Sequence, residues 1–175
     1  MLASLGTRQG TRPIEDVVSA VVDLIDALIP PTVFYVRLLN PETDENADVD
    51  RFFSEIVDPV VQGFGYEPVV MGHGANQFAW MNEAIFNHLH YSAAVVVDLT
   101  GLRNNCFMEL GYALGRGQRV LITAKKGTQM PFDAKMIEYY PWAQSDDSDK
   151  DQENFRDFWR RNINRPPIVG PRSIV

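Results

Sequence analysis

Short apolar runs alternate with segments of helical periodicity along the chain, which predicts an α/β protein with one sheet between two helical layers. The clearest unit is an apolar run at 93–97 that ends in Asp98, a polar turn, a helix-like segment at 106–114 and an apolar run at 120–123. This order is typical of a right-handed crossover between parallel strands. The pattern favours a flavodoxin-like three-layer sandwich with a mainly parallel sheet of four or five strands, preceded by an amphipathic helix.

The first predicted element is the amphipathic helix, over residues 13–29. Apolar residues recur at helical spacing, Pro13 suits the first turn, and two prolines at 30–31 stop the helix. Its apolar stripe is rich in valine, so we expect the helix to depend on contacts with the domain or with a second copy of the chain. The next run, 32–39, has the β-branched and aromatic residues of a buried parallel strand.

The middle of the chain continues the alternation. The acidic segment 40–50 is expected to be largely a solvated loop, and a helix is expected at 48–62, bent by Pro59. A second strand at 66–71, a glycine-rich loop and a helix at 77–90 lead into the central unit.

The C-terminal part predicts a short edge strand at 137–140, an acidic loop at 144–151 and a last helix at 153–161. A proline-rich tail follows. The predicted organisation is therefore a helical extension at 1–30, one α/β domain at 31–165 and an irregular tail at 166–175.

Composition narrows the classes of function. The chain has 175 residues, a formal net charge of −7 and one cysteine. The acidic balance argues against nucleic acid as a partner, and no apolar run approaches the roughly 20 residues that cross a membrane. A single cysteine fits a cytoplasmic protein without internal disulfides. Because no residues have metal-ligand spacing, we expect no metal. The sequence has no Walker-type phosphate loop and no G-x-G-x-x-G, so we expect no bound cofactor.

Two carboxylates flank the polar turn of the central unit. Asp98 ends a strand, and Glu109 lies about one turn into the next helix if Asn104 or Asn105 caps it. Ligands of open α/β sheets bind at the carboxyl ends of the strands, so we expect both carboxylates to face one cleft there. Each also has a structural interpretation, since Asp98 would cap the turn and Glu109 would complement the helix dipole.

Residues 98–122, DLTGLRNNCFMELGYALGRGQRVLI, resemble the motif of the nucleoside 2-deoxyribosyltransferase-like and TIR-like nucleotide-processing families. The likeness extends more weakly over 32–142. It implies a flavodoxin-like sheet and cleavage or transfer at the N-glycosidic bond of a nucleoside, a nucleotide or NAD. The matching positions make Glu109 the essential carboxylate, Asp98 the strand-end aspartate and Asn105, or Asn104, the loop asparagine. The chain departs from the pattern in the loop after its first strand and lacks the tryptophan that TIR enzymes carry ahead of the glutamate.

Five residues are candidates for binding the substrate. Backbone N–H groups at Asn104 and Asn105 would face a phosphate or ribose oxygen. Arg37 could reach a phosphate from the end of the first strand, although a surface charge is an equal interpretation. His73 lies in the glycine-rich loop on the expected ligand side, and Tyr35 is a loose match to an aromatic residue of the transferases.

The sequence thus favours a hydrolase or transferase that acts on a small nucleoside or nucleotide, with NAD as a substrate rather than a cofactor. A homo-oligomer is expected. The alternative is a non-catalytic nucleotide-binding or nucleotide-sensing module that self-associates through residues 13–29, and a third interpretation is a purely structural domain.

Overall fold

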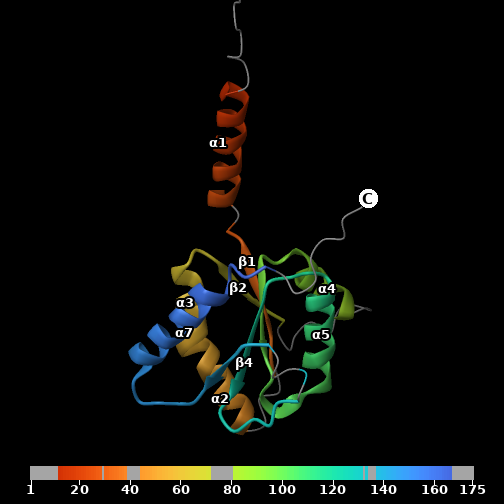
Figure 1. The fold of residues 1–175 in the computed structure, drawn as a ribbon, viewed down its shortest axis with the longest axis vertical. Coiled ribbons are helices and arrows are strands. Elements are labelled where there is room, and N and C mark those ends of the chain that lie inside the picture. Colours follow the sequence, from red (N-terminus) through yellow and green to blue (C-terminus); the bar gives the residue numbers. More distant parts are fainter. Residues whose placement is uncertain are drawn as a thin grey trace, which may run out of the picture. The chain divides into compact units, whose positions relative to one another are not determined.

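The computed structural model describes residues 12–28, 30–38, 44–71, 81–131, 133 and 137–166. The chain forms two compact units, Met1–Pro31 and Thr32–Val175. The first unit contains helix α1 (Arg12–Leu28), and the second contains a sheet with helices on both faces (Figure 1). Among the described residues, no helix has the length and apolar content that crossing a bilayer requires.

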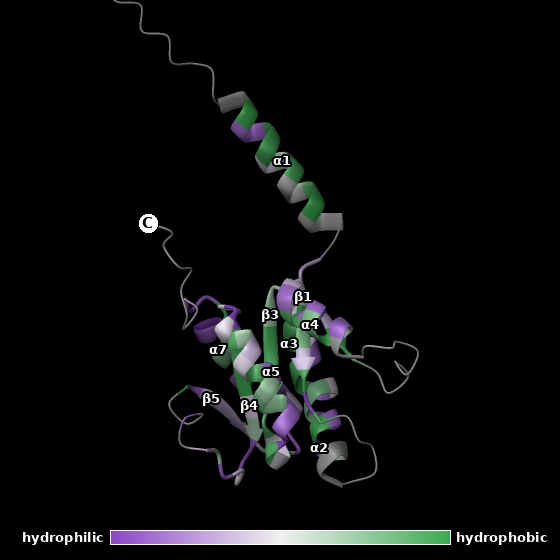
Figure 2. Ribbon diagram, turned by 90° about the vertical axis from the view of Figure 1, so that its right-hand side faces the viewer, coloured by the Kyte–Doolittle hydropathy of each residue, from purple (hydrophilic) through white to green (hydrophobic). Residues whose placement is uncertain are grey.

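Helix α1 agrees with the predicted amphipathic helix, whose last residue lies outside the described part. Hydrophobic residues recur along it (Figure 2). Six large hydrophobic side chains are 49–67% exposed: Ile14, Val17, Val18, Val21, Leu24 and Ile25. Such a stripe does not stabilise a helix in water by itself, because a helix of this length gains most of its stability from packing.

The sheet has five strands in the order β2-β1-β3-β4-β5, and every pairing is parallel. The strands are β1 (Thr32–Val36), β2 (Glu67–Val70), β3 (Ala94–Asp98), β4 (Val120–Lys125) and β5 (Tyr139–Trp142). This is the flavodoxin-like order, and its switch point lies between β1 and β3. The predicted fold class is confirmed. The predicted edge strand exists at an edge, two residues further along the chain than expected.

Helices cover both faces of the sheet (Figure 1). One layer contains α4 (Met81–Tyr91) and α5 (Asn104–Gly115). The other contains α2 (Asp44–Phe52), η1 (Phe53–Val57), α3 (Asp58–Gly63) and α7 (Ser148–Asn162). Alternation along β3 sends Ala94 and Val96 into the core beneath the second layer, and Val95 and Val97 into the core beneath the first. The sheet is therefore buried on both faces, which explains its continuous apolar runs.

The helix predicted at 48–62 is divided into three segments. Its middle, η1, is a π-helix, and α3 begins beside Pro59. Proline has no N–H to donate to the carbonyl of Glu55, four residues earlier. The side chain of Gln152 in α7 donates to that carbonyl instead, at 2.8 Å. The bend expected at Pro59 is thus a change of helix type, supported by a neighbouring helix.

Two segments expected to be loops are helical. α2 begins at Asp44 inside the acidic segment, and α7 begins at Ser148 inside the predicted loop 144–151. The Asp147 carboxylate accepts from the backbone N–H of Lys150 at 3.0 Å and caps α7. Acidic residues stabilise the first turn of a helix, so these stretches are helix starts that the loop interpretation missed.

Candidate active site

Asp98, the last residue of β3, is fully buried. Its carboxylate accepts three hydrogen bonds: from the backbone N–H of Thr100 at 3.0 Å, from the Thr123 hydroxyl at 2.7 Å and from the indole N–H of Trp142 at 2.8 Å. Burial raises the pKa of Asp98, and these donors partly oppose that rise. The carboxylate therefore ties together the carboxyl ends of β3, β4 and β5.

A tight turn links Asp98 to helix α5. Thr100–Leu102 form one turn of 3-10 helix, and both Gly101 (φ 72°) and Leu102 (φ 50°) have left-handed backbone conformations. The conformation of Leu102 costs energy for a residue with a branched side chain. Besides the bond from Thr100 N–H to Asp98, two bonds hold the turn: Leu102 N–H donates to Leu99 O at 3.0 Å, and the Thr100 hydroxyl accepts from the N–H of Lys125 at 2.9 Å.

Helix α5 starts differently from the prediction. Arg103, which has an extended backbone, is the N-cap, and no side chain caps the helix. Asn104 and Asn105 are the first two helical residues and are exposed. The predicted asparagine cap is therefore wrong, because the helix begins at Asn104 itself. The N–H groups at this helix start have no side-chain cap, which is the arrangement that favours an anion.

Glu109 lies in the second turn of α5 and is half-buried. Burial raises its pKa to about 7, and no hydrogen bond to its carboxylate occurs within the described residues. A carboxyl group with this pKa is present in both protonation states near neutral pH. It can thus accept or donate a proton, or act as a carboxylate toward a cationic centre.

Asp98 and Glu109 belong to opposite layers. Asp98 continues the alternation of Ala94 and Val96 toward α2 and α7, whereas Glu109 lies on α5. Both charges act on the Cys106 thiol, whose pKa is raised to about 12, first by burial and then by the two carboxylates. Cys106 is thus a protonated thiol at neutral pH. No hydrogen bond joins the two carboxylates in the described part of the chain. For Asp98 to contact a substrate, the residues that cover its buried carboxylate would have to move apart.

Arg37 and Tyr35, at the end of β1, are engaged within the protein. The Arg37 guanidinium forms an ion pair with Asp50 and lies over the ring of Phe53, 5.2 Å from its centre. Tyr35 is 3% exposed, and its ring packs on Phe53 at 4.9 Å between centres. Burial and then the neighbouring Asp58 carboxylate raise the pKa of the Tyr35 hydroxyl. A role for either residue in substrate binding stays a prediction.

His73 lies outside the described residues. Within the described part of the chain, no three His, Cys, Asp or Glu side chains gather as metal ligands. The described predicted site residues are therefore found at three places: the end of β3, the first two turns of α5 and the end of β1.

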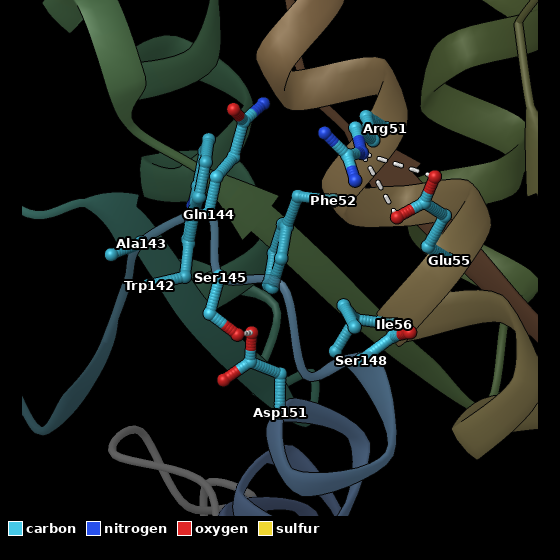
Figure 3. A pocket seen from close by; sticks show the side chains of 10 residues that line it. All are labelled: Arg51, Phe52, Glu55, Ile56, Trp142, Ala143, Gln144, Ser145, Ser148 and Asp151. Atoms are coloured by element: carbon cyan, nitrogen blue, oxygen red, sulfur yellow. Dashed lines mark hydrogen bonds and ion pairs between the residues drawn. The ribbon is translucent and has the colours of Figure 1, made fainter.

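A shallow surface pocket lies between α2, η1 and the segment that joins β5 to α7 (Figure 3). The rings of Phe52 and Trp142 stack there, 4.6 Å apart and nearly parallel. Polar side chains surround them, including Gln144, Asp151 and an Arg51–Glu55 ion pair. None of the predicted site residues lines this pocket. Trp142 thus lines this pocket and also donates to Asp98.

Two further side chains that the sequence did not indicate, Lys125 and Thr123, lie at the carboxyl end of β4. Lys125, at the end of β4, forms an ion pair with Asp48 of α2, and Gln144 donates to the same carboxylate. Thr123 completes the contacts of Asp98. These partners are 25 to 96 residues apart in the chain. Spacing in the sequence gives no signal for them.

Comparison with known proteins supports the fold. No protein-family model matches the sequence, and no curated protein matches it. The CMP N-glycosidase BcmB of Clostridium botulinum superposes with a TM-score of 0.51 at 9% identity, over 73% of this chain and 98% of that chain. The 2-deoxyribosyltransferase of Bacillus psychrosaccharolyticus gives 0.49 at 11% identity, over 79% and 99% of the two chains. The chain shares the fold of the CMP N-glycosidase. At these identities the likeness concerns the fold alone.

Proposed function

We propose that this protein cleaves or transfers at the N-glycosidic bond of a nucleoside, a nucleotide or NAD, with Glu109 as the essential carboxylate. The position of Glu109 carries the proposal. It is a half-buried acid within the N-x-x-x-x-E-L-G-Y-A motif, on the helix that follows the central strand, in a fold shared with a CMP N-glycosidase. Its raised pKa supports a chemical role. An acid that only complemented the helix dipole would lie in the first turn and would gain nothing from burial.

The chemistry follows from the charge that develops on the sugar. When the base leaves, the ribose carbon acquires oxocarbenium character, which a nearby carboxylate stabilises or captures covalently. Water would then complete hydrolysis, and a second base would complete transfer. The uncapped N–H groups at Asn104 and Asn105 would hold a ribose or phosphate oxygen of the substrate. In this proposal Arg37, Tyr35 and His73 remain candidates for contacting the substrate. Asp98 holds the turn from which helix α5 starts.

The test is a substrate panel of NAD, ribonucleotides, ribonucleosides and deoxynucleosides, with release of the free base measured by chromatography. We expect one class to be turned over, with kcat in Glu109→Gln lower by about 100-fold or more. Glu83→Gln, which changes an exposed glutamate on α4, is the control and should keep wild-type activity. Equal rates in wild type and Glu109→Gln, or no released base from any substrate, would reject the proposal.

The exposed apolar stripe of α1 favours a second candidate, a nucleotide-binding module that self-associates through this helix. It predicts that a nucleotide raises the Tm without product formation. It also predicts that Val21→Glu together with Ile25→Glu lowers the molar mass measured by light scattering to that of the monomer. An unchanged mass would exclude assembly through α1.

A further inference from the structure

Among the three donors to the buried Asp98 carboxylate, the indole N–H of Trp142 is the most distant along the chain. The two residues are 44 positions apart and belong to strands separated by β4. Trp142 is 2% exposed, and its ring stacks on Phe52 of α2. The indole is thus fixed on its flat face by Phe52 and at its N–H by Asp98. A side chain held at both its face and its edge has little freedom to move.

Asp98 transmits this restraint to the turn before α5. Its other carboxylate oxygen accepts from the N–H of Thr100, the first residue of that turn. Gly101 and Leu102 then adopt left-handed conformations, which persist only where the surroundings enforce them. α5 begins two residues after Leu102, so the direction in which the helix leaves the turn sets the place of Glu109.

We propose that Trp142 is a positioning residue for Glu109: its indole N–H fixes Asp98, and Asp98 fixes the Thr100–Leu102 turn from which α5 starts. The effect on the turn is independent of any activity, whereas the effect on catalysis rests on the proposed function of Glu109. Trp142 makes no contact with Glu109 itself among the described contacts, so its influence passes through the turn.

The chain offers a matched pair of variants to test this proposal. Trp142→Phe keeps an aromatic ring against Phe52 and removes the N–H that Asp98 accepts. Trp159→Phe is the control, because Trp159 is also fully buried in the same core and its N–H has no partner within the described residues. Both variants lose the same atoms, so any general cost of the substitution is shared.

Hydrogen exchange of the Thr100 and Leu102 amides, measured by NMR, reads the turn directly. We expect exchange about tenfold faster in Trp142→Phe and unchanged in Trp159→Phe, since only the first loses a hydrogen bond. In an Asp98→Asn background, Trp142→Phe should add no further acceleration, because the link is already broken. Equal exchange in wild type and Trp142→Phe, or equal acceleration in both tryptophan variants, would overturn the proposal.

Turnover supplies the catalytic readout. On the substrate found in the panel, Trp142→Phe should lower kcat about tenfold with KM changed less than twofold, because a displaced carboxylate impairs chemistry more than binding. Trp159→Phe should leave both constants unchanged. If no substrate is turned over, the proposed function fails while the exchange result still decides whether Trp142 holds the turn. Accelerated exchange with unchanged kcat would reject the positioning of Glu109.

Discussion

Asp98 and Glu109 are eleven positions apart, yet their carboxylates differ in burial and in hydrogen bonding. Asp98 at the end of β3 is fully buried and accepts three hydrogen bonds, so its charge is supported by the fold. Glu109 on α5 is half-buried without a donor to its carboxylate in the described part, and burial raises its pKa. Burial raises the pKa of both carboxyl groups, but only at Asp98 do hydrogen-bond donors oppose that rise. Asp98, held by three donors, is suited to holding structure, whereas Glu109, which burial alone affects, is suited to chemistry.

Neutralising the two carboxylates without changing their shape should separate their roles most strongly. In Asp98→Asn an amide NH₂ replaces one acceptor and faces buried donors, so we expect a loss of about 2–4 kcal/mol in the free energy of unfolding. Glu109→Gln should not destabilise the protein. Urea unfolding at pH 7 measures both. A loss in Glu109→Gln as large as in Asp98→Asn would show that Glu109 is also structural.

The pH dependence of stability sharpens the contrast at Glu109. Its pKa is about 7 in the folded protein, against an ordinary value of 4.5, so the folded state binds the proton more tightly. Stability contributed by this group is therefore full below about pH 4.5 and falls as pH rises toward 7. Allowing for solvent screening of a half-buried group, the loss is on the order of 1–2 kcal/mol.

Glu109→Gln should remove this dependence, becoming more stable than wild type at pH 8 and equal to it near pH 4. Thermal unfolding of both proteins across that range is the measurement. Parallel curves for the two proteins would mean that the folded-state pKa of Glu109 is ordinary.

A third carboxylate, Asp48 of α2, pairs with Lys125 at the end of β4. Its substitution should cause the smallest loss in the free energy of unfolding. Its ion pair and hydrogen bond with Lys125 lower its pKa, so it stabilises the fold above its ordinary range and loses that contribution as pH falls through the lowered value. The pair is largely solvated, and we expect Asp48→Asn to cost about 0.2–1 kcal/mol at neutral pH. The cost should shrink in 1 M salt. A larger, salt-insensitive loss would place Asp48 with Asp98 instead.

Several features of the fold are readable from the sequence because they depend on neighbours in the chain. Continuous apolar runs identify strands buried on both faces, and helical periodicity identifies α1, α4 and α5. Acidic residues allow two interpretations, because they are common both in solvated loops and in the first turn of a helix. The acidic residues around Asp44 and Ser148 were interpreted as solvated loops, although acids in a first turn stabilise a helix.

The sequence by itself determined the class of fold and the position of Glu109 on the helix after the central strand, because hydrophobic periodicity and chain order suffice for both. Only the tertiary structure decided how each carboxylate is treated. Alternation along β3 turns Asp98 toward the face of the sheet opposite α5, where β5, on the far side of β4, contributes the Trp142 indole from 44 residues away. Burial and hydrogen bonding set the pKa of a carboxyl group, and both depend on residues that the chain brings together only when it folds.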